Sequence, residues 1–131
     1  MSENTHILIV DDDPLMRRLF GGKLATVGYD IIYATNGNDG RETARRLQPD
    51  LILMDINMPG LENGIATAQR LVTEEATKNI PIIFLTNNDL TLDAEAAIKQ
   101  MAADYIHKSI DLDQFLEKIR TFLASRKKTQ P

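Results

Sequence analysis

Residues 49–60 read PDLILMDINMPG, and this stretch decides the fold. Four apolar residues, 51–54, follow one another with no polar residue between them. An uninterrupted apolar run of this length is typical of a strand buried on both faces of a parallel sheet. Asp55 comes directly after the run, where a carboxylate is costly unless it has a partner. The stretch therefore predicts a central strand that ends in a functional carboxylate.

Similar short apolar runs recur on both sides of this strand, and helical patterns separate them. We predict strands at 7–10, 30–34, 51–54, 80–85 and 104–106. Apolar residues at helical spacing predict helices within 16–27, 38–47, 65–72, 90–101 and 112–123. Five strand–helix units in this order predict an α/β fold with a doubly wound parallel sheet and helices on both faces.

The composition is that of one ordinary globular domain. The chain has 131 residues, of which 43% are hydrophobic and 26% charged, and this excludes wholesale disorder. With 15 Lys and Arg against 19 Asp and Glu, the net charge of -4 argues against direct nucleic-acid binding. The absence of cysteine excludes a disulfide scaffold, a thiolate zinc site and a cysteine nucleophile. We expect one domain over residues 1–124 and a polar, basic, flexible tail over 125–131.

No segment of the sequence suggests a membrane span or an export signal. The apolar runs are strand-sized, far shorter than a transmembrane helix requires. The N-terminus starts polar and its apolar run stops at an aspartate cluster, unlike a signal peptide. We therefore expect a cytoplasmic protein with no membrane partner.

Polar residues follow the predicted strands where each of them ends. In an open α/β sheet the functional crevice lies beyond the carboxyl ends of the strands, so these residues are expected to share one crevice. They are Asp11, Asp12 and Asp13 after the first strand, Asp55 after the third, Thr86, Asn87 and Asn88 after the fourth, and Lys108 after the fifth.

Carboxylates brought this close repel one another unless a cation joins them. Hard oxygen ligands with room for water suit Mg²⁺ better than zinc. The alternative is that the aspartates at 11–13 merely cap the first helix, although capping does not explain Asp55. Asp55 is the candidate nucleophile, since a carboxylate can attack phosphorus to give an acyl phosphate. Lys108 and the Thr86 hydroxyl could then stabilise the phosphoryl oxygens, although alone each could be an ordinary strand-end residue.

Other catalytic motifs are missing from the sequence. There is no histidine pair with metal-ligand spacing, and His6 and His107 are expected to be a surface and a structural residue. There is no dinucleotide or P-loop glycine motif and no serine nucleophile elbow.

The segments ILIVDDDP (7–14), PDLILMDINMPG (49–60), IPIIFLT (80–86) and DYIHK (104–108) together resemble the receiver domain of two-component response regulators. The resemblance covers about residues 5–124. It implies a flavodoxin-like receiver fold with five helices and strand order 2-1-3-4-5. It also implies a phosphoryl group on Asp55, donated by a phosphohistidine of a histidine kinase or histidine phosphotransfer protein.

The resemblance further implies the role of each site residue. Asp12, Asp55 and the Asn57 backbone carbonyl would bind Mg²⁺, and Asp11 would act through a bound water. Thr86 and Lys108 would contact the phosphoryl group, with Thr86 also part of the switch.

Tyr105 matches the aromatic switch position of the family, although it could simply be a half-buried strand residue. It would lie on an output face formed by the helix at 90–101, the strand at 104–106 and the helix at 112–123. The protein would be a phosphorylation-activated switch for an unknown downstream protein, able to form a phosphorylation-dependent homodimer. It would be no turnover enzyme, since it would catalyse only its own phosphorylation and dephosphorylation.

Four departures from the family pattern bear on switching. Ser109 follows Lys108 where proline, often after a cis bond, is usual, and a cis bond before serine costs several kcal/mol. Asn87 replaces a small residue, so it either narrows access to Asp55 or donates to the phosphate. The loop at 60–64 is one residue longer than usual, and Met101-Ala102-Ala103 replaces a Gly-Ala pair.

Two other function classes stay open at this point. A constitutive receiver-like binding module would keep the fold without phosphorylation. An aspartyl-phosphate phosphohydrolase of the haloacid dehalogenase type would need an Asp where Asn57 stands, and usually a cap domain as well.

Overall fold

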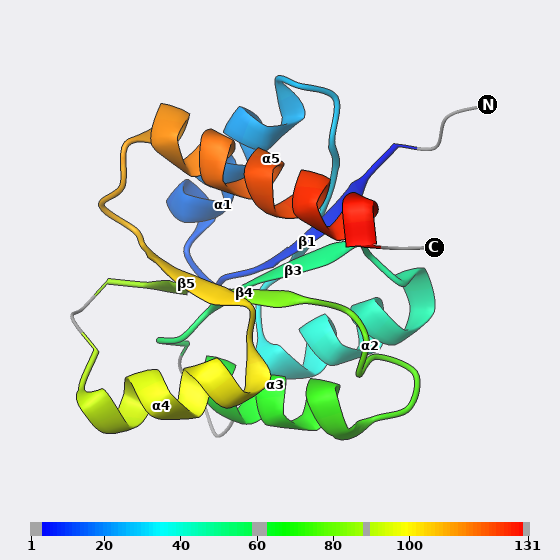
Figure 1. Cartoon of the computed structure of the whole chain (residues 1–131), viewed down its shortest axis with the longest axis vertical. Helices are drawn as coiled ribbons and strands as arrows, with labels where there is room; N and C mark the ends of the chain where they lie inside the picture. Colours follow the sequence, from blue (N-terminus) through cyan, green and yellow to red (C-terminus); the bar gives the residue numbers. More distant parts are fainter. Residues whose placement is uncertain (1–3, 59–62, 88–89, 130–131) are drawn as a thin grey trace.

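The computed structural model describes residues 4–58, 63–87 and 90–129. Strands and helices alternate along the whole described chain, as the sequence predicts (Figure 1). In chain order the elements are β1 (His6–Val10), α1 (Pro14–Ala25), β2 (Asp30–Ala34), α2 (Gly37–Leu47), β3 (Leu51–Asp55), α3 (Gly64–Thr73), β4 (Ile82–Thr86), α4 (Leu92–Met101), β5 (Asp104–His107) and α5 (Leu112–Thr129).

The five strands form one parallel sheet in the order β2-β1-β3-β4-β5. The central strand β3 is buried at every position, which explains why its sequence shows no polar alternation. Helices α1 and α5 cover one face of the sheet, and α2, α3 and α4 cover the other (Figure 1). The predicted doubly wound fold and its strand order are confirmed.

The core lies in two layers, one on each side of the sheet. Because successive strand residues point to opposite faces, Leu8 and Ile52 join the layer under α2, α3 and α4, whereas Ile7 and Leu53 join the layer under α1 and α5. In the second layer the rings of Phe20 and Phe115 lie 4.6 Å apart between centroids. The two layers hold the sheet rigid, so the carboxyl ends of its strands keep fixed positions.

Several element boundaries differ from those predicted from the sequence. Strand β4 begins at Ile82 rather than at residue 80, because the Ile80 N–H still closes a turn onto the Thr77 carbonyl and Pro81 has no N–H. Helix α4 begins at Leu92, since the Thr91 side chain caps it by accepting from Ala94 N–H. The backbone of α5 continues to Thr129, past the end predicted for this helix at residue 123.

Two adjacent glycines lie inside α1, and only one has a packing reason. A Cβ on Gly21 would lie 2.2 Å from the Tyr33 hydroxyl oxygen, so glycine leaves room for the Tyr33 ring of β2 to lie against α1. A Cβ on Gly22 would meet nothing within 4 Å. Nothing in the structure explains Gly22.

Candidate functional site

The carboxyl ends of three strands bring two carboxylates and one ammonium group together. The Lys108 Nζ lies 2.8 Å from Asp11 Oδ2 and 3.1 Å from Asp55 Oδ1. The side chains of Asp11, Asp55 and Lys108 are only 0, 2 and 5% exposed, respectively. Strands β1, β3 and β5 are far apart in sequence, so the parallel sheet alone makes this cluster possible.

Backbone and side-chain donors fix both carboxylates. Asp11 Oδ1 accepts from Asp13 N–H at 2.9 Å, and Asp55 Oδ1 accepts from Asn57 N–H at 3.1 Å. The Arg17 guanidinium of α1 donates to the Asp11 carbonyl at 2.7 Å, which ties the first turn of the helix to the end of β1. The two carboxylates are therefore held in place before any ligand arrives.

Asp12 adds a third carboxylate, at the exposed rim of the cluster. One oxygen from each of Asp11, Asp12 and Asp55 lies within 4.8 Å of the others. Three carboxylates and the Lys108 ammonium leave two negative charges, the charge that one Mg²⁺ ion neutralises. The residues present fit a magnesium site, because the donors are hard oxygens and the exposed side leaves room for water ligands.

Asp13 has a different role from its two neighbours. It is the N-cap of α1, and its side chain accepts from Leu15 N–H at 2.9 Å. Helix capping, the alternative considered for the whole aspartate run, is therefore correct for Asp13. Asp11 and Asp12 lie in the carboxylate cluster instead.

The cluster shifts the pKa values of its members. Burial raises the pKa of the Asp55 carboxyl, the Asp11 charge raises it further, and Lys108 and the Asn57 N–H oppose this without cancelling it. Burial lowers the pKa of Lys108, but its hydrogen bonds and ion pairs with Asp11 and Asp55 outweigh this and leave that pKa above the ordinary 10.5. Without a metal, the positive charge near Asp55 is too small to offset its burial and the repulsion from Asp11. Lys108, in contrast, stays protonated.

Thr86 and Tyr105 lie on the neighbouring strands β4 and β5. Thr86 is buried at the end of β4, one register position past Leu85, which pairs with Asp55. Its carbonyl accepts from Lys108 N–H at 2.7 Å. Tyr105 is half-buried on β5, and its hydroxyl donates to Glu95 of α4 at 3.0 Å; this bond is the main reason why the pKa of Tyr105 is raised.

The structure describes some of the four departures from the family pattern but not most of the lengthened loop. The described residues contain no cis peptide bond, so the Lys108–Ser109 bond is trans, and Lys108 reaches both carboxylates all the same. Asn87 is exposed at the end of β4. Asn88 and most of the lengthened loop, residues 60–62, lie outside the described residues.

Sequence reasoning missed three residues that shape the site. Arg17 contacts the Asp11 backbone, Glu95 holds Tyr105, and Gly64 lies against the backbone of Asp55. A Cβ on Gly64 would lie 2.0 Å from the Asp55 carbonyl oxygen. The signal for Gly64 is that it begins α3 without having a positive φ. Its backbone conformation does not require glycine, so close packing is the remaining reason for it.

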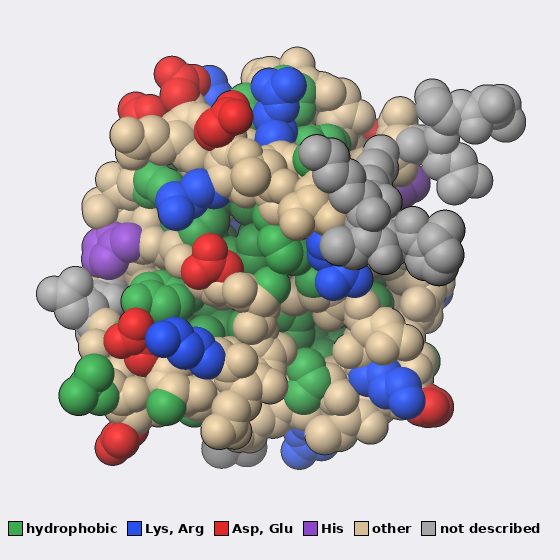
Figure 2. Space-filling view, viewed as in Figure 1, with side chains coloured by type: hydrophobic (Ala, Val, Ile, Leu, Met, Phe, Trp, Pro, Cys, Tyr) green, Lys and Arg blue, Asp and Glu red, His purple; other side chains and the backbone are tan. Residues whose placement is uncertain are grey.

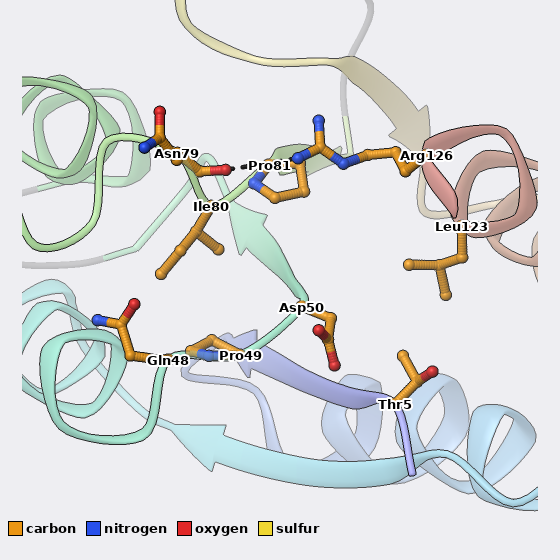
Figure 3. A pocket seen from close by; sticks show the side chains of 9 residues that line it. All are labelled: Thr5, Gln48, Pro49, Asp50, Asn79, Ile80, Pro81, Leu123 and Arg126. Atoms are coloured by element: carbon orange, nitrogen blue, oxygen red, sulfur yellow. Dashed lines mark hydrogen bonds between the residues drawn. The ribbon is translucent and has the colours of Figure 1, made fainter. Parts of the chain in front are cut away.

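A separate hollow of about 300 Å³ lies at the other end of the sheet, at the amino ends of β1, β3 and β4 (Figure 3). Its charged groups already have partners. Asp50 accepts from His6 N–H at 2.9 Å, and Arg126 donates to the Asn79 carbonyl at 3.5 Å. The carboxylate cluster contributes nothing to this hollow.

The chain matches the response regulator receiver domain over residues 7–120. It therefore belongs to the response regulator receiver family, the class that the fold and the site define. It is 39% identical to Protein PilH of Pseudomonas aeruginosa over 118 residues, 90% of this chain and 97% of that protein. It is 32% identical to the polar-differentiation response regulator DivK of Brucella anthropi, over 90% of this chain and 95% of that protein.

A solved structure similar to this one contains a metal. It is the receiver domain of the Pseudomonas aeruginosa sensor histidine kinase PA1611, with a magnesium ion in its active-site cleft. The TM-score is 0.82 at 25% identity, covering 93% of this chain and 99% of that one. Within residues 4–58, 63–87 and 90–129, no helix is long and apolar enough to cross a membrane. The cytoplasmic location stays a prediction.

We expect Asp55→Asn to raise the stability of the metal-free protein at neutral pH. Folding raises the pKa of Asp55, so this carboxyl favours the folded state fully below the ordinary value of 3.8 and loses that contribution as the pH rises through the raised value. Asn does not titrate, so the gain in melting temperature over the wild type should grow across this window towards neutral pH. Circular dichroism melts in EDTA at a series of pH values measure it.

Magnesium provides the control for this expectation. The ion should stabilise the wild type by about 2.7 kcal/mol at a hundredfold excess over its dissociation constant and leave Asp55→Asn almost unchanged. A gain from Asp55→Asn that is equal at every pH, or that persists in saturating Mg²⁺, would contradict the electrostatic explanation.

Proposed function

We propose that the protein is a phosphorylation-controlled switch in which Asp55 accepts a phosphoryl group from a phosphohistidine. The observation that carries the proposal is the buried contact of Lys108 with Asp11 and Asp55 at the carboxyl end of the sheet. A purely structural core would not retain two adjacent buried carboxylates, because their desolvation is costly. Membership of the receiver family supports the same assignment.

The reaction is a displacement at phosphorus. A carboxylate oxygen of Asp55 forms a bond to the phosphorus, the phosphorus–nitrogen bond of the donor breaks, and its electron pair returns to the imidazole. The carboxylate gives up no proton, so no general base is needed. Such transfers depend on positioning and on charge stabilisation at the equatorial oxygens. We assign Lys108, which contacts Asp55, to one of these oxygens and the Thr86 hydroxyl to another.

We assign Mg²⁺ to Asp12, Asp55 and the Asn57 backbone carbonyl, with Asp11 acting through a bound water. When bound, the ion supplies positive charge for the phosphoryl oxygens during transfer. Asp11 is already held by Asp13 N–H and Lys108, which suits a residue that orients water rather than the ion itself. The magnesium in the PA1611 receiver supports this assignment.

We propose that Thr86 and Tyr105 transmit the phosphorylation. Thr86 and Lys108 share a backbone hydrogen bond, so a phosphoryl group that draws in both side chains acts on β4 and β5 together. Tyr105 would then leave Glu95 and turn inward, which changes the face formed by α4, β5 and α5. The phosphoryl group thereby biases a two-state equilibrium of this face.

The face formed by α4, β5 and α5 is suited to a protein partner. Figure 2 shows hydrophobic side chains in a hollow across the middle of this face, with charged side chains of both signs around it. A groove of about 740 Å³ is lined by Asp104 of β5 and by α5 side chains that include Lys118 and Phe122. We assign the downstream protein, or a second copy of the chain, to this face.

The phosphoryl donor is a different partner, which we propose to be a histidine kinase or a histidine phosphotransfer protein. It must approach the open side of the carboxylate cluster, where Asp12 is exposed. Leu15 and Leu19, in the first two turns of α1 just after Asp12 and Asp13 in the chain, are large apolar side chains that are exposed. A protein donor can cover them, whereas a small phosphate ester cannot.

Intact mass measurement after incubation with acetyl phosphate and Mg²⁺ tests the proposed function. We expect one phosphoryl adduct that requires Mg²⁺, is removed by hydroxylamine and is absent from Asp55→Asn. Asp13→Asn is the matched control: Asn is an equally good helix cap and Asp13 is no part of the cluster, so labelling should persist.

Other outcomes would overturn the proposal. An adduct that survives in Asp55→Asn would place the phosphoryl group elsewhere. No adduct with either acetyl phosphate or a phosphohistidine protein would indicate a constitutive binding module. Steady multiple turnover of a phosphate ester would indicate a phosphohydrolase.

A further inference from the structure

The turn between β5 and α5 contains a contact that the proposed function does not use. Ser109 N–H donates to the Nδ1 atom of His107 at 3.2 Å, and the Ser109 hydroxyl oxygen lies 2.8 Å from the same nitrogen. The turn is closed by Ile110 N–H, which donates to the His107 carbonyl at 3.1 Å. Lys108, whose ammonium group contacts Asp11 and Asp55, lies between these two residues in the sequence.

The contact matters because of the peptide group to which its donor belongs. Ser109 N–H and the Lys108 carbonyl share one planar trans peptide, so fixing the N–H direction also fixes the carbonyl side of Lys108. On its other side, Lys108 N–H donates to the Thr86 carbonyl at 2.7 Å. Both peptide planes around the Lys108 Cα are therefore held, and with them the direction in which its side chain leaves the backbone.

Lys108 needs such restraint more than most residues do. Its side chain is a flexible four-carbon stem whose ordering costs about 2 kcal/mol of rotamer entropy. It must nevertheless reach Asp11 and Asp55 at once, at 2.8 and 3.1 Å. A turn that rotates freely after Lys108 would move the ammonium group off at least one of the two carboxylates.

We propose that His107 and Ser109 are positioning residues for Lys108: the His107 imidazole accepts the Ser109 N–H and thereby aims the lysine at Asp55 and its phosphoryl group. The device depends on a residue at 109 that has an N–H, which proline lacks. His107 supplies the acceptor from an exposed position outside the hydrophobic core, so the pair sets the geometry of the site without supporting the fold. This inference rests on the proposed phosphorylation of Asp55.

Two substitutions at His107 distinguish its role as a hydrogen-bond acceptor from a role in which the ring only fills space. His107→Phe keeps a ring of similar size and removes the acceptor. His107→Asn keeps an acceptor, since the side-chain carbonyl oxygen of asparagine can replace Nδ1. We expect the Mg²⁺-dependent labelling rate with acetyl phosphate to fall on the order of tenfold in His107→Phe, because a misplaced lysine stabilises the transferring group poorly. His107→Asn should restore the rate to within about twofold of the wild type.

Two further readouts do not depend on phosphorylation. Exchange of the Ser109 amide hydrogen, followed by NMR, should be slow in the wild type and in His107→Asn but fast in His107→Phe. The Mg²⁺ affinity from calorimetry should not weaken in any variant, because none of the oxygen ligands moves. Melting temperatures of the two variants should agree closely.

The outcomes distinguish this inference from the proposed function. If the wild type is never labelled, the proposed function fails, and amide exchange still reports whether the turn is held. If the wild type is labelled and His107→Phe is equally fast, the inference is overturned. It is also overturned if His107→Asn is as slow as His107→Phe, or if the Ser109 amide of the wild type exchanges freely.

Discussion

Gly64→Ala is expected to destabilise the protein by about 3 kcal/mol and to slow the labelling of Asp55 by about a hundredfold. The added Cβ would lie 2.0 Å from the Asp55 carbonyl oxygen, 2.8 Å from the Asp55 carbonyl carbon and 2.9 Å from the Ile56 Cα. All three are backbone atoms, so no side-chain rotation can relieve the overlap. The start of α3 and the Asp55 backbone must therefore move apart, and a shift of Asp55 displaces the proposed nucleophile.

The same chain offers a matched control for this glycine substitution. Gly22→Ala places a Cβ in open space within α1, so it should stabilise the protein by up to about 1 kcal/mol through helix propensity alone. Urea titrations followed by circular dichroism give both free energies of unfolding, and intact mass gives the labelling rate. Wild-type stability and labelling in Gly64→Ala would show that α3 is not held against the Asp55 backbone.

The residues that meet at the site could be predicted because the sheet is parallel. Asp11 follows the buried strand β1, Asp55 ends the buried strand β3, and Lys108 follows the edge strand β5. Parallel strands of one sheet end at a common edge. The contact of these three residues thus follows from the strand pattern and the strand order. For the same reason the central position of β3 could be inferred from its uninterrupted apolar sequence.

What could not be predicted depends on the path of the backbone between the elements. The sequence places three aspartates in a row, but only the observed turn shows that Asp13 caps α1 while Asp11 is buried against Lys108. Likewise, only the structure shows that Gly64 lies against the Asp55 backbone. The trans peptide before Ser109 could be decided only from the structure as well.

Lys108→Met is expected to lower the stability of the metal-free protein by about 3 kcal/mol at neutral pH, because removing one partner leaves buried charges unpaired. Asp11 and Asp55 are 0 and 2% exposed, so water cannot replace the ammonium group. Mg²⁺ should restore most of the lost stability and should bind Lys108→Met more tightly than the wild type, since Lys108 no longer repels the ion. Labelling with acetyl phosphate should nevertheless remain slow, because the ion does not replace the contact that we propose between Lys108 and the phosphoryl group.

The pH dependence of this stability loss has a definite sign. The pKa of Lys108 is raised above 10.5 by folding, so its contribution is complete below that value and is lost as the pH rises through the raised value. The difference between the wild type and Lys108→Met should therefore shrink at strongly alkaline pH. It should also shrink in acid, where Asp55, with its raised pKa, takes up a proton and needs no partner.

Lys78→Met provides the comparison at the surface. Lys78 pairs with Glu75 at 2.6 Å, as closely as Lys108 pairs with Asp11, but the two side chains are 45 and 81% exposed. An exposed pair contributes about 0–1 kcal/mol, so this variant should unfold almost like the wild type and show no response to Mg²⁺. If Lys108→Met behaves in the same way, the cluster is solvated, and the buried charge on which the proposed phosphorylation of Asp55 depends is absent.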